Sequence, residues 1–261
     1  MLHPSKKNQE MLPESWLRLA LAAGSLCLAI PLFSVEYLPL LDLPQHIGSV
    51  AILSGANPDH NFEIYYETQL LSSPYLLTYL IASVFAWVTG PLIALKLLFA
   101  ASIVTLPWAT AYAARSFQRD PLVALFISPL CYGSFFFLGF LNFVFSLPLL
   151  LFFLGWWHRQ SQKPNFGWQQ FIAGMCLTVL LFLGHVLILG FALLAVPLIS
   201  ATARGKNPFT QMPGREELRR MLHAAPSMIL LLVWLIVFLQ LVLLLLILFA
   251  QLPLLPLRQG N

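Results

Sequence analysis

Long apolar runs, separated by short polar segments, fill most of the chain from residue 16 onward. Apolar runs of roughly 18 or more residues with few charges are typical of helices that span a membrane. A helix satisfies its own backbone hydrogen bonds in lipid, and the short alternating segments of a β-barrel are absent from the sequence. The pattern therefore predicts an all-α fold, a polytopic transmembrane helical bundle that forms one integral-membrane domain over residues 1–261.

The order of the runs predicts the parts of this domain. A polar N-terminus, 1–15, precedes a first span that ends near residue 35, and a loop over 36–73 follows. The remaining bundle occupies 74–250, and a short tail occupies 251–261. Within the bundle, the apolar pieces are predicted over 74–89, 91–113, 121–138, 140–157, 168–200 with a break at Gly184-His185, and 226–250.

Charge along the chain predicts the orientation of these segments. The loop 36–73 contains five acidic residues and no Lys or Arg, whereas the turns 115–120 and 158–167 and the loop 201–225 are basic. Basic loops stay on the cytoplasmic side. All three basic segments, together with the N-terminus, lie in the cytoplasm if 74–113 crosses the membrane only once. We therefore expect 74–89 to be a re-entrant or interfacial helix, which leaves about seven crossings.

Composition excludes several classes of protein. The chain is 59% hydrophobic and 9% charged, whereas soluble domains have about 25% charged residues. Its net charge of +4 comes from Lys and Arg in short loops and termini and not from a basic face. We therefore expect membrane lipid as a partner and no binding to nucleic acid. The three cysteines lie in separate apolar runs, which favours neither a disulfide framework nor a zinc site. Nucleotide-binding, serine-hydrolase and zinc-protease motifs are also absent.

The segment 37–50, Y-L-P-L-L-D-L-P-Q-H-I-G-S-V, contains the most informative polar residues. Pro44 can occupy the first turn of a helix, so a short amphipathic helix is predicted over 46–53, ended by Gly55. Asp42 and His46 are four residues apart and can share one face. Such a carboxylate could act as a general base, or the pair could hold a divalent metal ion, Mg or Mn. In the structural alternative, Asp42 caps the helix and His46 is incidental.

Two further polar residues are predicted on the outer side of the membrane. His185 follows Gly184 at the expected helix break, where it could line a cavity open to the outside or bond a carbonyl freed by the break. Asn142 follows Gly139 at the joint between two apolar runs. We list His46, Asn142 and His185 as candidate substrate-binding residues.

The layout resembles the integral-membrane glycosyltransferases of the GT-C superfamily, the bacterial enzymes that depend on polyprenyl-phosphate sugars. The resemblance lies in a cytoplasmic anchor, an acidic residue soon after the first span in Leu41-Asp42-Leu43-Pro44-Gln45-His46, a Pro-aromatic entry at Ser73-Pro74-Tyr75, and the basic turn 115–120. The second acidic loop motif of the family has no acidic counterpart at 139–142.

The resemblance implies a sugar transferase of the bacterial cytoplasmic (inner) membrane. It implies that a sugar passes from a polyprenyl-phosphate-linked donor to an extracytoplasmic acceptor, with Asp42 as the general base. Because of the missing acidic motif, a truncated or inactive relative is also an expectation. The alternative function is that of a non-enzymatic multi-pass membrane protein, either an assembly partner or a small transporter.

Overall fold

The structure is a computed structural model, and every regular element in the part of the chain that it describes is a helix. The described residues are 13–55, 62–68, 70, 73–127, 131–163, 166–202 and 214–251. Most of the predicted N-terminal segment, much of the basic loop 201–225 and the tail after residue 251 therefore lie outside the described residues.

The helices differ widely in length. Six are long: α1 (Glu14–Ser34), α4 (Pro91–Ser116), α7 (Leu141–Ser161), α8 (Trp168–Gly184), α9 (Val186–Thr202) and α11 (Ala225–Gln251). Two of intermediate length are α2 (Leu43–Ser54) and α3 (Leu76–Thr89). The others are the short helices α5 (Val123–Phe126), α6 (Ser134–Phe137) and α10 (Arg215–Met221), and the 3₁₀ turns η2 (Phe62–Ile64) and η5 (Leu222–Ala224).

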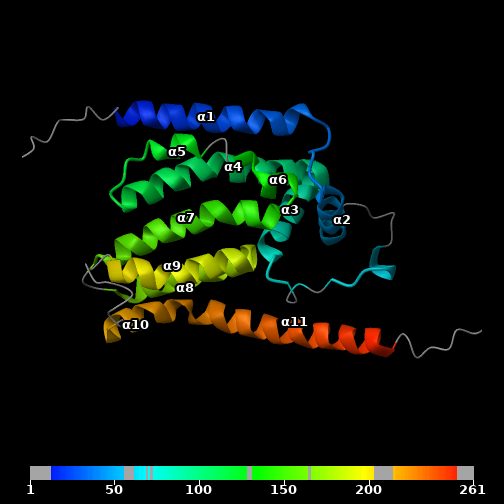
Figure 1. The fold of residues 1–261 in the computed structure, drawn as a ribbon. Coiled ribbons are helices and arrows are strands. Elements are labelled where there is room, and N and C mark those ends of the chain that lie inside the picture. The colour runs from blue at the N-terminus through cyan, green and yellow to red at the C-terminus, as the bar shows by residue number, and fades with distance from the viewer. Residues whose placement is uncertain are drawn as a thin grey trace, which may run out of the picture.

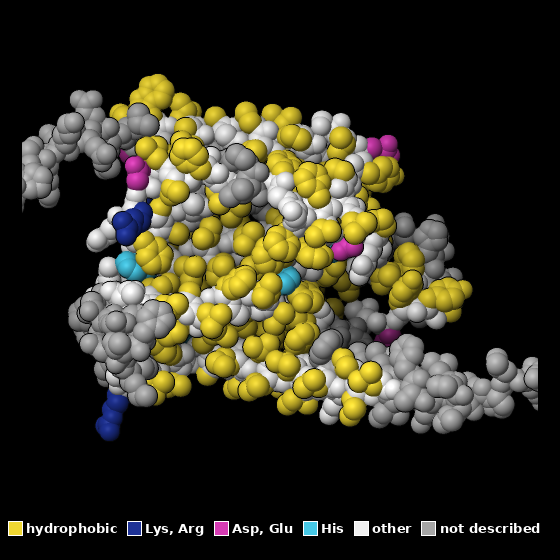
Figure 2. Space-filling view, viewed as in Figure 1, with side chains coloured by type: hydrophobic (Ala, Val, Ile, Leu, Met, Phe, Trp, Pro, Cys, Tyr) yellow, Lys and Arg dark blue, Asp and Glu magenta, His cyan; other side chains and the backbone are white. Residues whose placement is uncertain are grey.

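The long helices run side by side along one direction, and α2 and α3 gather at one end of the bundle (Figure 1). In the order α1, α4, α7, α9 and α11, the helices succeed one another across the bundle, and α8 lies beside α9. Hydrophobic side chains cover most of the face seen in Figure 2, while Lys and Arg gather at the end where α1 begins. The bundle thus has an apolar flank and two polar ends, which suits a protein that lies across a membrane.

Helices α4 and α7 form the most extensive helix pair, at the centre of the bundle. Their close approach depends on small residues. A Cβ atom added to Gly155 of α7 would lie 2.8 Å from the Tyr112 ring of α4. Small residues allow helix backbones to approach closely in membranes, where van der Waals contact rather than the hydrophobic effect holds helices together.

The apolar interior has two main parts. One is formed chiefly by α2, α3, α4 and the start of α7, with Phe99 and Leu95 fully buried. The other lies among α7, α8 and α9, around the buried rings of Phe153 and Trp157. A polar contact lies at the edge of the first part, where the buried Lys96 ammonium donates a hydrogen bond to the Val35 carbonyl at the end of α1.

Three predicted breaks are present. Helix α2 ends at a left-handed Gly55, α3 and α4 meet at Gly90-Pro91, and α8 and α9 meet at His185. Each break coincides with glycine or proline, which end helices because of backbone freedom or a missing amide proton.

The apolar run 121–138 is not one continuous helix, although an unbroken apolar run was expected to form one. Its α-helices in the described part are the one-turn helices α5 and α6, and residues 128–130 lie outside the described part. The run contains Pro129 and Gly133, the two residue types with the lowest helix propensity. Hydrophobicity alone therefore overestimated the helix content of this segment.

Within the described residues, four helices are long and apolar enough to cross a membrane. They are α1, α4, α7 and the stretch Leu218–Val237, which includes the first half of α11. Helices α3, α8 and α9 are apolar but shorter. The fold is therefore that of an α-helical membrane protein, as the sequence predicted.

Candidate functional site

The site begins where the first loop enters α2. Pro44 occupies the first turn of this helix, where its missing amide proton is not needed, and Asp42 stands at the N-cap position. The Asp42 side chain makes no capping hydrogen bond, contrary to the structural alternative proposed from the sequence. The half-buried carboxylate of Asp42 is thus not used to hold the helix end.

His46 joins three parts of the chain and is buried. Its Nε2 lies 2.6 Å from the Gly139 carbonyl oxygen, and its Nδ1 lies 2.8 Å from the Tyr79 hydroxyl. Because a carbonyl only accepts, Nε2 carries the proton, and Nδ1 accepts from Tyr79. His46 is therefore neither incidental nor free to bind a metal, since protein groups occupy both ring nitrogens.

Gly139 brings the turn before α7 against the start of α2. Its φ of +85° lies in the region that favours glycine, and an added Cβ would be 2.9 Å from the Asp42 amide nitrogen. The Leu41 amide also donates to the Phe137 carbonyl at 3.0 Å. The first loop is in this way docked on the α6–α7 turn, about a hundred residues later in the chain.

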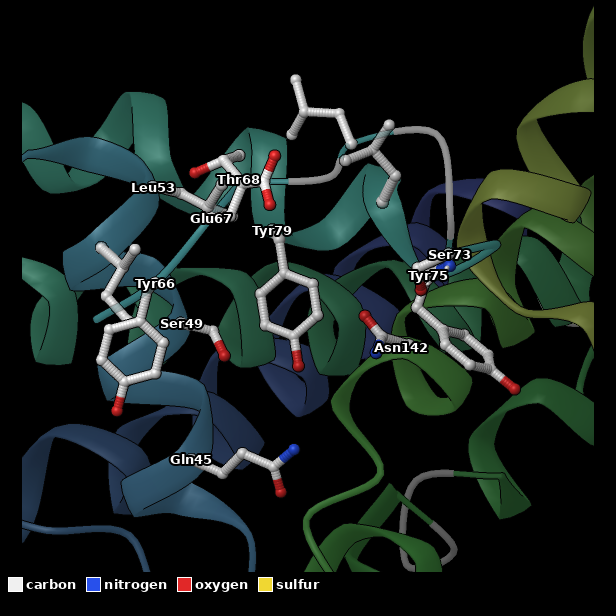
Figure 3. A pocket seen from close by; sticks show the side chains of 13 residues that line it. Gln45, Ser49, Leu53, Tyr66, Glu67, Thr68, Ser73, Tyr75, Tyr79 and Asn142 are labelled. Atoms are coloured by element: carbon white, nitrogen blue, oxygen red, sulfur yellow. Dashed lines mark hydrogen bonds between the residues drawn. The ribbon is translucent and has the colours of Figure 1, made fainter. Parts of the chain in front are cut away.

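Helix α3 supplies the wall opposite α2. The Tyr79 hydroxyl lies close to the side chains of Asn142 and Ser49, in addition to its bond with His46 (Figure 3). Asn142 Oδ1 is buried and has no hydrogen-bond partner among the described residues. An unpartnered buried acceptor is uncommon in native proteins and calls for a donor from a ligand or water.

His185 stands at the break between α8 and α9. Its Nδ1 accepts a hydrogen bond from the Leu187 amide at 3.2 Å. One hypothesis from the sequence was that His185 bonds a carbonyl freed by the break, but this nitrogen instead satisfies an amide of α9. Its ring packs against Tyr75 and Phe143, with centroids 4.9 and 5.3 Å apart. The bond to Leu187 leaves Nε2–H as the donor of this ring.

All four residues singled out from the sequence line one pocket of about 340 Å³, which we call the Asp42 pocket. They reach it from α2, α7 and the α8–α9 break. The lining consists of Asp42, Gln45, His46, Tyr75, Tyr79, Gly139, Phe140, Leu141, Asn142, Phe143 and His185.

A second pocket of about 410 Å³ adjoins the first, and we call it the Tyr66 pocket (Figure 3). Gln45, Tyr75, Tyr79 and Asn142 belong to both linings. Burial raises the pKa of the Tyr75 phenol above its ordinary value, so this hydroxyl stays protonated at neutral pH and can donate. The shared wall therefore presents hydrogen-bonding groups to both pockets.

The residues at the site do not fit a metal held by the protein. Among the described residues, no three His, Cys, Asp or Glu side chains lie close enough together to bind one ion. The hypothesis that Asp42 and His46 hold Mg or Mn loses its second ligand, because both nitrogens of His46 are already bonded. Divalent cations in proteins generally take several oxygen ligands, and Asp42 alone is a poor site.

Sequence reasoning did not select Gln45, Ser49, Tyr75 or Tyr79 as site residues. A signal for them was present: Asp42, Gln45 and Ser49 recur at helical spacing, and Tyr75 and Tyr79 are four residues apart. Residues three or four apart share one helix face, so both helices present a polar stripe in an otherwise apolar chain. That these two stripes face each other depends on tertiary packing.

Comparison of the chain with protein-family models, with curated proteins and with solved structures finds no match. The assignment of function therefore depends on the geometry of the site and on the membrane fold.

Proposed function

We propose that the chain is a membrane glycosyltransferase that moves a sugar from a lipid-phosphate donor to an extracytoplasmic acceptor, with Asp42 as general base. One observation carries the proposal: Asp42, His46, Asn142 and His185, from distant parts of the chain, line one pocket at the end of the bundle. The Asp42 carboxylate lines this pocket and makes no capping bond. A carboxylate that is not used for capping can accept a proton as a general base.

The proposed reaction requires one proton acceptor and one departing group. Asp42 takes the proton of an acceptor hydroxyl, and the oxygen of that hydroxyl forms a bond to the anomeric carbon of the sugar. The bond between the anomeric carbon and the lipid phosphate oxygen breaks, and its electron pair leaves with the polyprenyl phosphate. Asn142 Oδ1 and the Nε2–H of His185 supply an acceptor and a donor that position the reacting sugar.

The proposal includes an orientation in the bacterial cytoplasmic membrane, with the N-terminus in the cytoplasm and about seven crossings. Six crossings are the long helices, and the seventh is the return of the chain through α5 and α6. The non-crossing α3 leaves Asp42 and Glu36 at the outer end, while Arg115 and Arg159 lie at the cytoplasmic end.

Accessible cysteines test the orientation. In a cysteine-free background, Glu67→Cys is expected to react with an impermeant thiol reagent from outside intact cells, and Lys163→Cys only after the membrane is opened. Both positions are exposed, so reactivity reports the side of the membrane. Labelling of Lys163→Cys in intact cells contradicts the orientation.

The catalytic role is tested by Asp42→Asn, with Glu36→Gln as the matched control on the same loop. Loss of a general base typically costs 10²- to 10⁴-fold in rate. Transfer of radiolabelled sugar from polyprenyl-phosphate donors to envelope acceptors is expected to fall by about that factor in Asp42→Asn membranes and to be unchanged in Glu36→Gln. The amount of monodisperse protein is expected to stay constant, because Asp42 makes no capping bond. Full transfer by Asp42→Asn rejects the catalytic role of Asp42, whereas wild-type membranes that transfer no more sugar than membranes without the protein favour the non-enzymatic alternative.

A further inference from the structure

The Tyr66 pocket is lined largely by side chains that can form hydrogen bonds. Nine of the thirteen described residues that line it have a side chain with a hydrogen-bonding group, and three of the nine are tyrosines. The nine are Gln45, Ser49, Tyr66, Glu67, Thr68, Ser73, Tyr75, Tyr79 and Asn142. With a volume of about 410 Å³, the pocket falls within the range of sites for small molecules.

The kinds of polar group in the lining favour a neutral ligand. Amides and hydroxyls both donate and accept hydrogen bonds, whereas Glu67, the one charged residue among the described residues of the lining, is acidic. Among the described residues, the lining contains no Lys, Arg or His. Phosphate groups are bound by cations or by clustered backbone amides, so this lining does not suit the phosphate of a donor.

Two features favour a ligand rich in hydroxyl groups. Asn142 lines both pockets, and its buried Oδ1 has no partner among the described residues and therefore calls for a donor. The Tyr66 ring is 58% exposed at the other side of the pocket and offers an amphipathic face with a polar tip. A sugar ring, with an apolar face and a rim of hydroxyls, matches both features.

We infer that the Tyr66 pocket binds the neutral carbohydrate acceptor, and that an acceptor hydroxyl reaches Asp42 across the wall shared by the two pockets. The inference rests on the proposed transferase function and assigns a ligand class to residues that the sequence did not single out. Gln45, which lines both pockets, lies one helical turn from Asp42 and from Ser49 and would contact the acceptor on its way to the base.

The test measures binding rather than transfer. The whole protein in lipid nanodiscs, without maltoside detergents that would compete, is titrated with the methyl glycosides of glucose, galactose and mannose. Saturation-transfer NMR gives the affinity. Glucose 6-phosphate serves as a probe with similar hydroxyls and added negative charge.

At least one neutral glycoside is expected to bind, and glucose 6-phosphate is expected to bind at least about tenfold more weakly, because Glu67 opposes it without a compensating cation. Ser49→Ala is expected to weaken the glycoside about fivefold, as expected for the loss of one hydrogen bond. Asn142→Ala is expected to weaken it by a similar or larger factor. Ser54→Ala is the matched control, because Ser54 is on the same helix and outside both linings.

Three outcomes overturn the inference: no glycoside binds at millimolar concentration, the phosphate binds as well as the neutral sugar, or Ser49→Ala and Asn142→Ala bind like Ser54→Ala. Asp42→Asn separates the two proposals, because it is expected to retain glycoside binding while losing transfer. Binding with full transfer in Asp42→Asn rejects only the catalytic role. Loss of transfer in Asp42→Asn, without glycoside binding in any variant, rejects only the acceptor pocket.

Discussion

Helices α7 and α11 are both long and strongly apolar, but they pack very differently. In the most apolar stretch of α7, 56% of residues are buried, against 22% in the stretch Leu218–Val237. Helix α7 contacts α4, α8 and α9 and starts at the candidate site, whereas α11 lies at the edge of the bundle (Figure 1). Large apolar side chains such as Leu239 and Leu246 remain about 60% exposed on α11.

The difference lies in the small and polar residues. Gly155 and Ser146 of α7 meet other helices at short distance, and Asn142 places an amide at the site. The apolar stretch of α11 is composed almost entirely of Leu, Ile and Val. In lipid, these side chains gain little by leaving one apolar environment for another, so hydrophobicity does not decide which helices pack together. The contrast predicts where substitutions are costly.

The largest effect is expected for Gly139→Ala, before the start of α7. Alanine disfavours a φ of +85°, and its Cβ would lie 2.9 Å from the Asp42 amide nitrogen, so the cost is about 2–4 kcal/mol. Thermal unfolding of the purified protein measures this loss. Gly48→Ala in α2 is the control, since its Cβ would enter open space. Equal melting temperatures for the two variants would show that the Asp42–Gly139 contact does not hold the site together.

The next effect is expected for His46→Leu, which leaves the Gly139 carbonyl without its partner and removes one of the contacts of the Tyr79 hydroxyl. The expected loss of stability is about 2–3 kcal/mol, because an unpaired buried carbonyl costs about 1–3 kcal/mol and a lost hydrogen bond about 1 kcal/mol. Tyr79→Phe alone should cost about 1 kcal/mol. The double variant is expected to lose less than the sum of the two, since both substitutions remove the same hydrogen bond. Strict additivity would show that the His46–Tyr79 bond is not formed in solution.

A smaller effect is expected at the α4–α7 contact, for Gly155→Ala. The added Cβ would lie 2.8 Å from the Tyr112 ring, and displacement of that ring should cost about 1–2 kcal/mol. Gly190→Ala on α9, where the Cβ meets no atom within 4 Å, should leave stability unchanged or raise it slightly. Thermal unfolding of both variants ranks the two positions. A higher melting temperature for Gly155→Ala than for Gly190→Ala would contradict close packing of α4 on α7.

The smallest effect is expected on α11. Leu239→Val removes one methylene from a side chain that is 58% exposed and should change stability by less than about 0.5 kcal/mol. The same substitution at Leu150 of α7, which is 8% exposed, should cost about 1 kcal/mol. A large loss from Leu239→Val would show that α11 has a tightly packed neighbour in the membrane.

The sequence predicted the helical class and the main breaks because these depend on local properties. Apolar runs indicate helices in lipid, and Gly90-Pro91 and Gly184-His185 interrupt them through backbone chemistry that acts within a few residues. The failure at 121–138 has the same origin, because its apolar residues were counted while the effect of Pro129 and Gly133 was not. Helix ends were thus more predictable than helix continuity.

The site was predictable only in part. Polar residues in apolar surroundings are conspicuous, and this property alone led to Asp42, His46, Asn142 and His185. Their partners depend on contacts between distant segments, such as the bond from His46 to Gly139. The same contacts determine that His46 bonds Tyr79 and Gly139 and that Tyr79 lines the pocket. No local pattern contains this information.

The bond between His46 and Gly139 joins residues 93 positions apart. At a synthesis rate of about 5–20 residues per second, the ribosome needs roughly 5–20 s to reach the second residue after the first. During this interval the first loop is already made, but the groups that close the Asp42 pocket are not. The Asp42 pocket is therefore complete only after the start of α7 has been made, so any activity of this pocket depends on the order of synthesis.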